Sequence, residues 1–488
     1  MFLNERAAGV RNLALWAGIG TRVVREHAIF LMNWHPAGPL FLFENRKING
    51  YMHFKIRKWF CKTSTAWILV YGFLLVILAG TILLWLPVSH NPGVRLSFLD
   101  ALFESTSAVC VTGLTVVSPG DTFNLFGRFV LGILIQIGGM GVVLLGIMLI
   151  RIAGGRLDLK TRSLFVAAQN LTDYYDLPRL ATIILRITFT IEGVGAFLLW
   201  FPLMRYFDPL KAAGHAIFLA VSAFNNAGFD VFRGSESLIP YAGDAALIMI
   251  ISLLVILGGF GFIAMCDLFK KRFHWRKLML TTKVAVFMTV FLLFGGMILF
   301  LLTTDETPLE AWFQSVITRT AGFASYPLSQ FSQGALLIFI ILMFIGASPN
   351  STGGGIKTTT AFMIALKAIS SGTAHDEDSV FHRRVPSLVF DKAFTVLFYG
   401  LTVVLVGTVL LCLFESGLAL SDALAEVVSA FATVGSSTGI TSSLGTASRI
   451  VLILTMFTGR LGPVTIANLL VTGDEKEARY TEENVLIG

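Results

Sequence analysis

The sequence predicts an all-α polytopic membrane protein in which four repeats of span, pore helix, filter and span surround one pore with pseudo-fourfold symmetry. Two observations support this. The 488-residue chain is 55% hydrophobic and only 14% charged, with a mean hydropathy of +0.76, which excludes an ordinary soluble domain. In addition, a short segment ending at glycine occurs in four versions, which is typical of a membrane protein built from internal repeats.

The four versions of this segment end at Gly113, Gly228, Gly322 and Gly435. They read Ser-Ala-Val-Cys-Val-Thr-Gly, Ser-Ala-Phe-Asn-Asn-Ala-Gly, Ile-Thr-Arg-Thr-Ala-Gly and Ser-Ala-Phe-Ala-Thr-Val-Gly. Each follows a short amphipathic run, and the glycines lie roughly 95–115 residues apart, as expected for structural repeats around a common axis.

Each segment is predicted to be one quarter of a cation filter. Irregular backbone at membrane depth must be buried in protein or line a water-filled path. Rings of carbonyl groups can replace the hydration shell of an alkali cation, and glycine allows the backbone angles that aim them inward. The preceding helix C-terminus adds a negative dipole end. The predicted filter residues are Val111, Thr112, Gly113, Asn226, Ala227, Gly228, Thr320, Ala321, Gly322, Thr433, Val434 and Gly435.

Residues 1–64 form a basic segment, predicted to be cytoplasmic, in which no hydrophobic run is long enough to span a bilayer. It lacks the pattern of a signal peptide. Two interpretations remain open: a surface helix on anionic lipid, or upstream sequence with the true start at Met52.

Residues 65–488 are predicted to form the ion-conducting domain, with repeats at about 65–155, 178–270, 278–371 and 389–475 and then a short cytoplasmic tail. Each repeat has two spans with a re-entrant segment between them. The eight expected spans are about 67–86, 125–152, 180–206, 241–269, 280–302, 334–370, 391–414 and 447–472.

Lys and Arg gather in the connections between repeats, which places those connections on the cytoplasmic side. The net charge of +7 is therefore explained by topology and does not indicate a nucleic-acid partner. We expect a multi-pass protein of the cell (inner) membrane, with both termini in the cytoplasm and the filters toward the outside.

The sixth span contains Gly-Ala-Ser-Pro-Asn-Ser-Thr-Gly-Gly-Gly-Ile-Lys-Thr at 346–358, which a lipid-facing helix does not need. We predict a broken helix that lines the pathway below the filter and acts as a gate. The alternative, a phosphate-binding loop, is disfavoured because the spacing is wrong and no buried strand precedes it. The predicted gate residues are Gly346, Ser351, Thr352, Gly353, Gly354, Gly355, Lys357 and Arg460.

Two charged residues lie inside predicted spans. Arg460 in the last span is expected to form an electrostatic barrier near the pore and to pair with carbonyl groups of the gate loop, to which Lys357 would add. The alternative is an arginine that snorkels to the membrane boundary. For Glu192 both a structural partner such as Arg186 and a pore-facing role remain open.

Other charged residues accompany the filter segments. Glu104, Glu310 and Glu426 in the pore-helix regions are as well suited to capping or bonding backbone as to attracting ions. Arg319 lies inside the third filter run, and its side chain is expected to point behind the filter because a cation facing the pore would repel the ion.

The chain has no pattern typical of an enzyme or a metal site. Its eight histidines are dispersed, and Cys61, Cys110, Cys266 and Cys412 have no metal-ligand spacing. We therefore predict no catalytic residues and no cofactor in this chain beyond the transported ion.

The four filter glycines, the interruption at 346–358 and Arg460 together resemble the Trk/Ktr/HKT superfamily of potassium transporters, and most closely the bacterial Ktr membrane subunit. The resemblance covers about 66–488. It implies potassium uptake by a homodimer with one pore per protomer, controlled by a cytoplasmic ring of nucleotide-binding subunits from another gene. Gly113 resembles the potassium-permeable type, whereas serine there accompanies sodium preference in plant relatives. A sodium-conducting or less selective transporter, or a sodium-coupled one, stays open.

Overall fold

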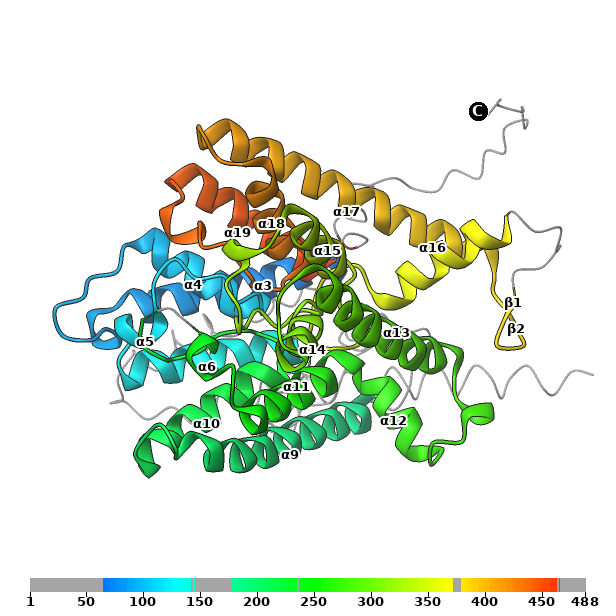
Figure 1. The fold of residues 1–488 in the computed structure, drawn as a ribbon, viewed down its shortest axis with the longest axis horizontal. Helices are drawn as coiled ribbons and strands as arrows, with labels where there is room; N and C mark the ends of the chain where they lie inside the picture. The colour runs from blue at the N-terminus through cyan, green and yellow to red at the C-terminus, as the bar shows by residue number, and fades with distance from the viewer. Residues whose placement is uncertain are drawn as a thin grey trace, which may run out of the picture. The chain divides into compact units, whose positions relative to one another are not determined.

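The computed structural model describes residues 65–141, 144, 177–234, 237–371, 379–462 and 465. The predicted basic segment at 1–64 and the tail lie outside these residues. Most of the described chain is helical (Figure 1). The described strands are β1 (Ser379–Val380) and β2 (Arg383–Arg384), which pair antiparallel.

Four long helices open the repeats: α3 (Thr65–Trp85), α9 (Leu177–Leu203), α13 (Leu280–Thr303) and α17 (Ser387–Phe414). These four are long and apolar enough to cross a membrane, and they agree with the spans predicted at 67–86, 180–206, 280–302 and 391–414. Large apolar side chains remain exposed on them, for example Leu75, Phe291 and Phe398. Such faces suit contact with lipid.

A shorter, buried helix follows each long one: α4 (Phe98–Cys110), α10 (Pro209–Phe224), α14 (Pro308–Ile317) and α18 (Leu420–Ala432). Each packs against the long helix of its own repeat (Figure 1). Their starts are well defined: Ser97 caps α4, and Thr307 forms a capping box with Glu310 at α14. All four end in the interior, where the predicted filter runs begin.

The second helices of the repeats are α6 (Leu125–Met140), α11 (Ala245–Phe260) with α12 (Phe262–Lys270), α15 (Gln333–Phe344) with α16 (Thr358–Ser370), and α19 (Thr446–Leu461). The predicted interruption of the sixth span is confirmed at 345–357. The other described helical segments are short turns: α5 (Pro119–Thr122), η1 (Pro87–Ser89), η2 (Ile239–Tyr241), η3 (Trp275–Lys277), η4 (Leu328–Gln330) and η5 (Thr441–Ser443).

The spans predicted at 125–152, 241–269 and 447–472 are interrupted at a glycine within the described residues, while most of 142–152 and 463–472 lies outside them. The helices stop at Gly141, Gly261 and Gly462, whose φ angles are 87°, 96° and 85°. A right-handed helix cannot continue through a positive φ, which L-residues avoid and achiral glycine adopts readily. The clearest consequence is the 93° bend between α11 and α12.

Close contacts hold three second helices against their pore helices. A Cβ added to Gly138, Gly258 or Gly459 would lie 2.8, 2.8 and 2.7 Å from a pore-helix carbonyl carbon. The carbonyls belong to Val109, Phe224 and Phe431, each four residues before a filter glycine. The same backbone contact thus supports the filter run in three repeats.

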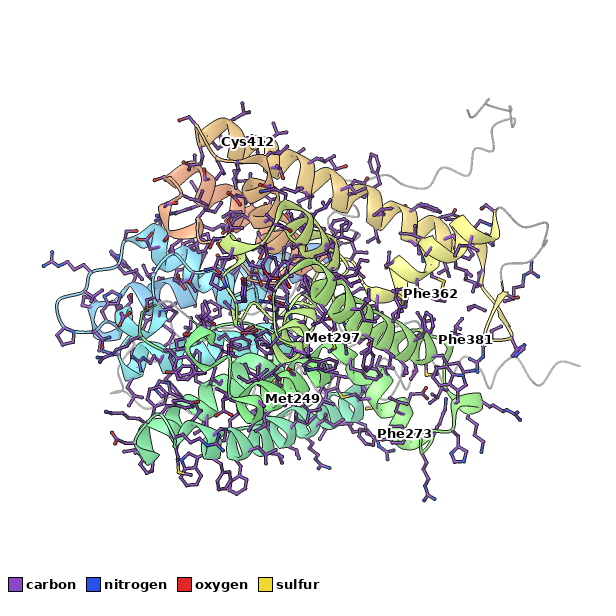
Figure 2. All side chains as sticks on the ribbon, viewed as in Figure 1. Met249, Phe273, Met297, Phe362, Phe381 and Cys412 are labelled. Carbon is purple, nitrogen blue, oxygen red and sulfur yellow. The ribbon has the colours of Figure 1, made fainter. Side chains whose placement is uncertain are left out.

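The hairpin β1–β2 follows the helix that leaves the interrupted span. Phe381 at its tip packs edge-on against Trp275, with ring centres 5.8 Å apart, and against Phe287 of α13 at 6.4 Å. Arg383 donates to the Leu278 carbonyl at 3.1 Å. Figure 2 shows Phe381 on the hairpin beside α13. These contacts connect the chain beyond α16 to the α12–α13 corner.

Candidate functional site

The four predicted filter runs share one backbone pattern. Their glycines have φ angles of 94° at Gly113, 69° at Gly228, 49° at Gly322 and 94° at Gly435. The residue two positions earlier in each run is also left-handed, in the order Val111 (59°), Asn226 (58°), Thr320 (85°) and Thr433 (52°). Left-handed residues that are not glycine are uncommon, so their recurrence at one register marks equivalent positions.

The four glycines meet in a closed ring. A Cβ added to Gly113 would lie 3.3 Å from the Cα of Gly228, and one on Gly228 would lie 2.7 Å from the Cα of Gly322. A Cβ added to Gly322 would lie 3.0 Å from the Cα of Gly435, and one on Gly435 would lie 2.9 Å from the Cα of Gly113. Each glycine faces the residue before the next glycine as well. No side chain fits between the runs at this level.

Most carbonyl groups of the filter runs accept no hydrogen bond from any described residue. The exception among the twelve predicted filter residues is Ala321, whose carbonyl accepts from the Phe323 amide at 2.6 Å. By contrast, the amides are bonded to the pore helices: Gly113 and Gly435 donate to the hydroxyls of Ser107 and Ser429, each at 3.0 Å. Amides held outward and carbonyls left available are the arrangement that cation coordination requires.

The loop at 345–357 lies against the other end of the filter runs. A Cβ on Gly353 would approach the Thr320 Cβ to 3.0 Å, and one on Gly354 would approach the Thr433 Cβ to 3.1 Å. Thr352 Oγ1 lies 3.1 Å from the side-chain amide of Asn226. All three filter residues stand two positions before their glycine. The loop therefore lies on the side of the filter away from the glycine ring.

Hydrogen bonds attach this loop to the break between α11 and α12. Ser348 donates through its amide to the Gly259 carbonyl at 3.0 Å, and the Phe262 amide donates to the Asn350 carbonyl at 2.8 Å. Within the loop, Lys357 Nζ donates to the Gly353 carbonyl at 2.6 Å. Ser351 donates to the Ser348 carbonyl at 2.5 Å. The Lys357 side chain therefore forms a hydrogen bond within the loop to which it belongs.

Arg460 joins the loop to the first repeat. It lies in the last turn of α19 and donates to the carbonyls of Thr352 and Gly138, and at 3.4 Å to that of Gly139. The predicted pairing with a gate-loop carbonyl is therefore present. Arg460 follows Gly459 as Gly139 follows Gly138, so the fourth repeat carries a guanidinium where the first has no side chain.

Two cavities flank this arrangement. One of about 360 Å³ is lined by the four filter glycines and the segments that follow them. The other, of about 650 Å³, is lined by Gly353 to Gly355, Lys357, Arg460 and parts of α3, α13 and α17. The filter runs and the loop therefore have open space at both ends.

Glu192 has structural partners, but Arg186, the example considered from the sequence, is not one of them. Its carboxylate, 5% exposed, accepts from Gln136 Nε2 at 3.2 Å and from Asn225 Nδ2 at 2.9 Å. Asn225 Nδ2 also donates to Gln136 Oε1 at 3.0 Å. Arg186 forms no ion pair with Glu192 in the described chain. Because Asn225 stands three residues before Gly228, this network supports the second filter run.

The remaining charged residues take structural positions. Glu104 accepts from the Val116 and Val117 amides, and Glu426 bonds the Thr441 hydroxyl, so both tie a pore helix to the segment beyond its filter run. Glu310 completes the cap of α14. Arg319 is buried and donates to Thr289 of α13 at 3.3 Å, away from the ring, as predicted.

Sequence reasoning missed the network of Gln136, Glu192 and Asn225 and the breaks in the second helices. The breaks had a visible signal: Gly-Gly-Met-Gly, Gly-Gly-Phe-Gly and Gly-Arg-Leu-Gly end three of these helices. The network had no such signal in the sequence, because its three residues come from two repeats. Within the described ranges, no three His, Cys, Asp or Glu side chains gather as a metal site would need.

Comparison with known sequences identifies relatives over most of the chain. The family TrkH, described as "Cation transport protein", matches residues 42–305 and 275–476. The chain is 34% identical to "Ktr system potassium uptake protein D" of Bacillus subtilis, covering 90% of this chain and 100% of that protein. It is 36% identical to "Ktr system potassium uptake protein B" of Vibrio alginolyticus, with coverage of 86% and 94%. "Potassium/sodium uptake protein NtpJ" of Enterococcus hirae is 35% identical, with coverage of 89% and 99%.

The fold has a counterpart among solved structures. The crystal structure of the potassium transporter TrkH from Vibrio parahaemolyticus matches with a TM-score of 0.63 at 22% identity, covering 82% of this chain and 85% of that one. The helical architecture and the sequence relationships lead to one conclusion: the chain belongs to the TrkH family of cation transport proteins.

Proposed function

We propose that this protein is the ion-translocating subunit of a potassium uptake system. The observation that carries the proposal is the ring of four glycines flanked by carbonyl groups that accept no hydrogen bond from described residues. Oxygen dipoles fixed around an axis compensate a potassium ion for its lost hydration. The relatives named as potassium uptake proteins support the same ion.

The ring functions as a selectivity filter in a fourfold pore. The equivalent left-handed residues and the repeated glycine contacts support four structurally equivalent quarters around one pathway. Transport needs no chemical step, because oxygen ligands supply selection and the ion moves down its electrochemical gradient.

The loop at 345–357 and Arg460 form the gate. The loop packs against Asn226, Thr320 and Thr433, directly beside the filter. A guanidinium and the Lys357 ammonium on this side oppose passage of a cation by repulsion. Opening requires the loop to leave this position, and its run of three glycines gives the backbone freedom to do so.

The functional unit is a homodimer in the cell membrane, with one pore per protomer and both termini in the cytoplasm. A separate cytoplasmic ring of nucleotide-binding subunits controls the gate. Support comes from the word "system" in the names of the Ktr relatives and from the basic α12–α13 corner, which positive-inside topology places in the cytoplasm.

A less selective, sodium-conducting or sodium-coupled transporter is the second candidate. One relative is named as a potassium/sodium uptake protein, and this supports retaining sodium as a possible ion. Selectivity measurements separate the two candidates.

The test is cation flux into proteoliposomes that contain the purified protein, with potassium, rubidium and sodium compared in wild type and in Gly113→Ser. Potassium and rubidium entry well above sodium, with sodium gaining in the variant, is the expected result. Equal entry of all three ions would instead establish an unselective pathway. If wild type admits no ion, the comparison is repeated in a variant without Gly353 to Gly355, and absence of flux there too rejects a conducting role.

A further inference from the structure

The cavity on the glycine side of the ring has one charged side chain among its described lining residues. That residue is Asp230, two positions after Gly228. The rest of the lining consists of backbone, apolar side chains and neutral polar groups such as Gln314, Ser436 and Thr441. A single carboxylate therefore sets the electrostatic character of this cavity.

The Asp230 carboxylate is held in place by its own loop. It accepts from the Phe232 amide at 3.1 Å and is hydrogen-bonded to the Ser237 hydroxyl. In the described part of the chain it has no ion-pair partner. The titratable group that faces it is Tyr241, which is neutral near pH 7. The negative charge of Asp230 is thus uncompensated at the mouth of the ring.

Other charges of this face are engaged elsewhere. Asp121 accepts from the Gly234 amide at 2.9 Å and from Ser118, with Arg128 and Arg233 nearby. It does not line the cavity. Asp121 is therefore a suitable control for Asp230, because it is an aspartate on the same face of the molecule that does not line the cavity.

We propose that Asp230, with the hydroxyl and carbonyl groups around it, forms a binding site for a monovalent cation that supplies the glycine ring. A fixed carboxylate in a concave, partly desolvated cavity concentrates cations and speeds their entry. Only one charge is present, so the site favours a monovalent over a divalent ion. This inference rests on the proposed potassium uptake and adds the step before the filter.

Protonation provides a specific test. Burial raises the pKa of the Asp230 carboxyl to about 6, whereas hydrogen bonds from the Gly234 amide and from Ser118 hold the pKa of Asp121 below its ordinary value. Above about pH 6 Asp230 is charged and attracts cations; below it the group is neutral. Asp121 stays ionised over this range. Weak acid should therefore reduce affinity through Asp230 and not through Asp121.

The experiment measures rubidium uptake into proteoliposomes of the full chain, with the same pH on both sides, in wild type, Asp230→Asn and Asp121→Asn. Asparagine keeps the acceptor oxygen for the Phe232 amide, so it removes the charge with little change in shape. In Asp230→Asn we expect KM to rise by about tenfold near pH 7.5 with Vmax within about twofold. In wild type and Asp121→Asn, KM should rise between about pH 7.5 and about pH 5, and in Asp230→Asn this rise should be absent.

Three results would overturn the site: an unchanged KM in Asp230→Asn, a pH dependence retained in that variant, or an equal effect of Asp121→Asn. If Asp230→Asn does not fold, the wild-type pH profile and Asp230→Glu, which keeps the charge, decide instead. A wild-type KM that does not rise in acid rejects the site. Absence of rubidium uptake by wild type and by the glycine-triplet deletion would count against the proposed function itself, so the two failures are distinguishable.

Discussion

At the scale of single residues, the filter glycines have two independent reasons for lacking a side chain. Gly228 has a φ of 69°, and a Cβ there would lie 2.7 Å from the Ala321 carbonyl oxygen. The left-handed φ would cost an L-residue about 1–2 kcal/mol. The added Cβ would displace the Ala321 carbonyl, which is a proposed ion ligand. The ring therefore tolerates neither the conformation nor the volume of alanine.

We expect Gly228→Ala to abolish potassium flux in proteoliposomes while leaving the protein inserted. Gly214→Ala is the matched control, because Gly214 lies in the same repeat, on pore helix α10, with open space around its Cβ position. That change should add up to about 1 kcal/mol of helix stability and leave flux unchanged. Normal flux in Gly228→Ala would contradict the role of the ring.

The Glu192 network makes a prediction about stability. Glutamine at 192 offers one acceptor oxygen where the carboxylate offers two, so either the Gln136 amide loses its bond to residue 192 or the Asn225 amide loses one of its bonds. A buried polar group left without a partner costs about 1–3 kcal/mol. Glu192→Gln should lower the Tm in detergent. It should also reduce potassium flux, because the second filter run loses the support of this network. An unchanged Tm would show that the carboxylate does not stabilise this network.

At the scale of elements, the breaks in the second helices decide how the gate loop is held. Gly261 and Gly462 have similar φ angles, 96° and 85°. At Gly261 an added Cβ would collide with the Pro349 carbonyl of the loop, whereas at Gly462 it would meet nothing within 4 Å. The two glycines thus share conformational strain but differ in contact with the loop.

Gly261→Ala and Gly462→Ala separate these effects. Both substitutions should cost about 1–2 kcal/mol of stability, because both impose a left-handed φ on alanine. Only Gly261→Ala should also displace the loop and change flux in the absence of a regulatory partner. Thermal unfolding and rubidium uptake measure the two quantities. Equal flux changes in both variants would mean that the Pro349 contact does not hold the loop.

Shortening the gate loop gives the most direct test of its role. Deletion of Gly353 to Gly355 removes the contacts with Thr320 and Thr433 and the carbonyl that Lys357 binds. We expect flux to rise without the regulatory partner. Flux that stays low in a folded, inserted deletion variant would show that the loop is not the gate.

At the scale of the whole molecule, the first and fourth repeats are joined directly. Arg449 of α19 lies 2.5 Å from Asp100 of α4, both side chains about 20% exposed, and α19 packs against α4. Arg460 joins the same repeats at the other end through the Gly138 carbonyl. The chain therefore closes on itself around the ring of four glycines, and this ring should unfold as one unit with all four repeats.

Orientation in the membrane is testable on the whole molecule. In a variant without the native cysteines, Asp208→Cys and Lys277→Cys introduce thiols at exposed positions on the α9–α10 and α12–α13 connections. Positive-inside topology predicts that a membrane-impermeant maleimide labels the first in intact cells and the second only after lysis. The reverse pattern would place the filter on the cytoplasmic side.

Local chemistry allowed much of this molecule to be predicted from the sequence. The four long spans follow from continuous apolar runs, and the filter register follows from a recurring glycine that no other residue can replace. The interruption at 345–357 follows from glycine and proline within one span. The helix breaks at Gly141, Gly261 and Gly462 were missed although each lies at the end of a glycine-rich run, because glycine in an apolar run is also tolerated inside a helix and does not by itself specify a bend.

The sequence by itself determined the membrane class, the recurring glycine segments and which residues are proposed as filter and loop, because these depend on residue type at short range. Only the tertiary structure decided that the glycines close into a ring, that Arg460 bonds Thr352 and Gly138, and that Glu192 is held by Gln136 and Asn225. Likewise it alone placed Asp230 in the cavity beside the ring. These contacts join residues from different repeats, and such pairing depends on how helices pack rather than on any pattern along the chain.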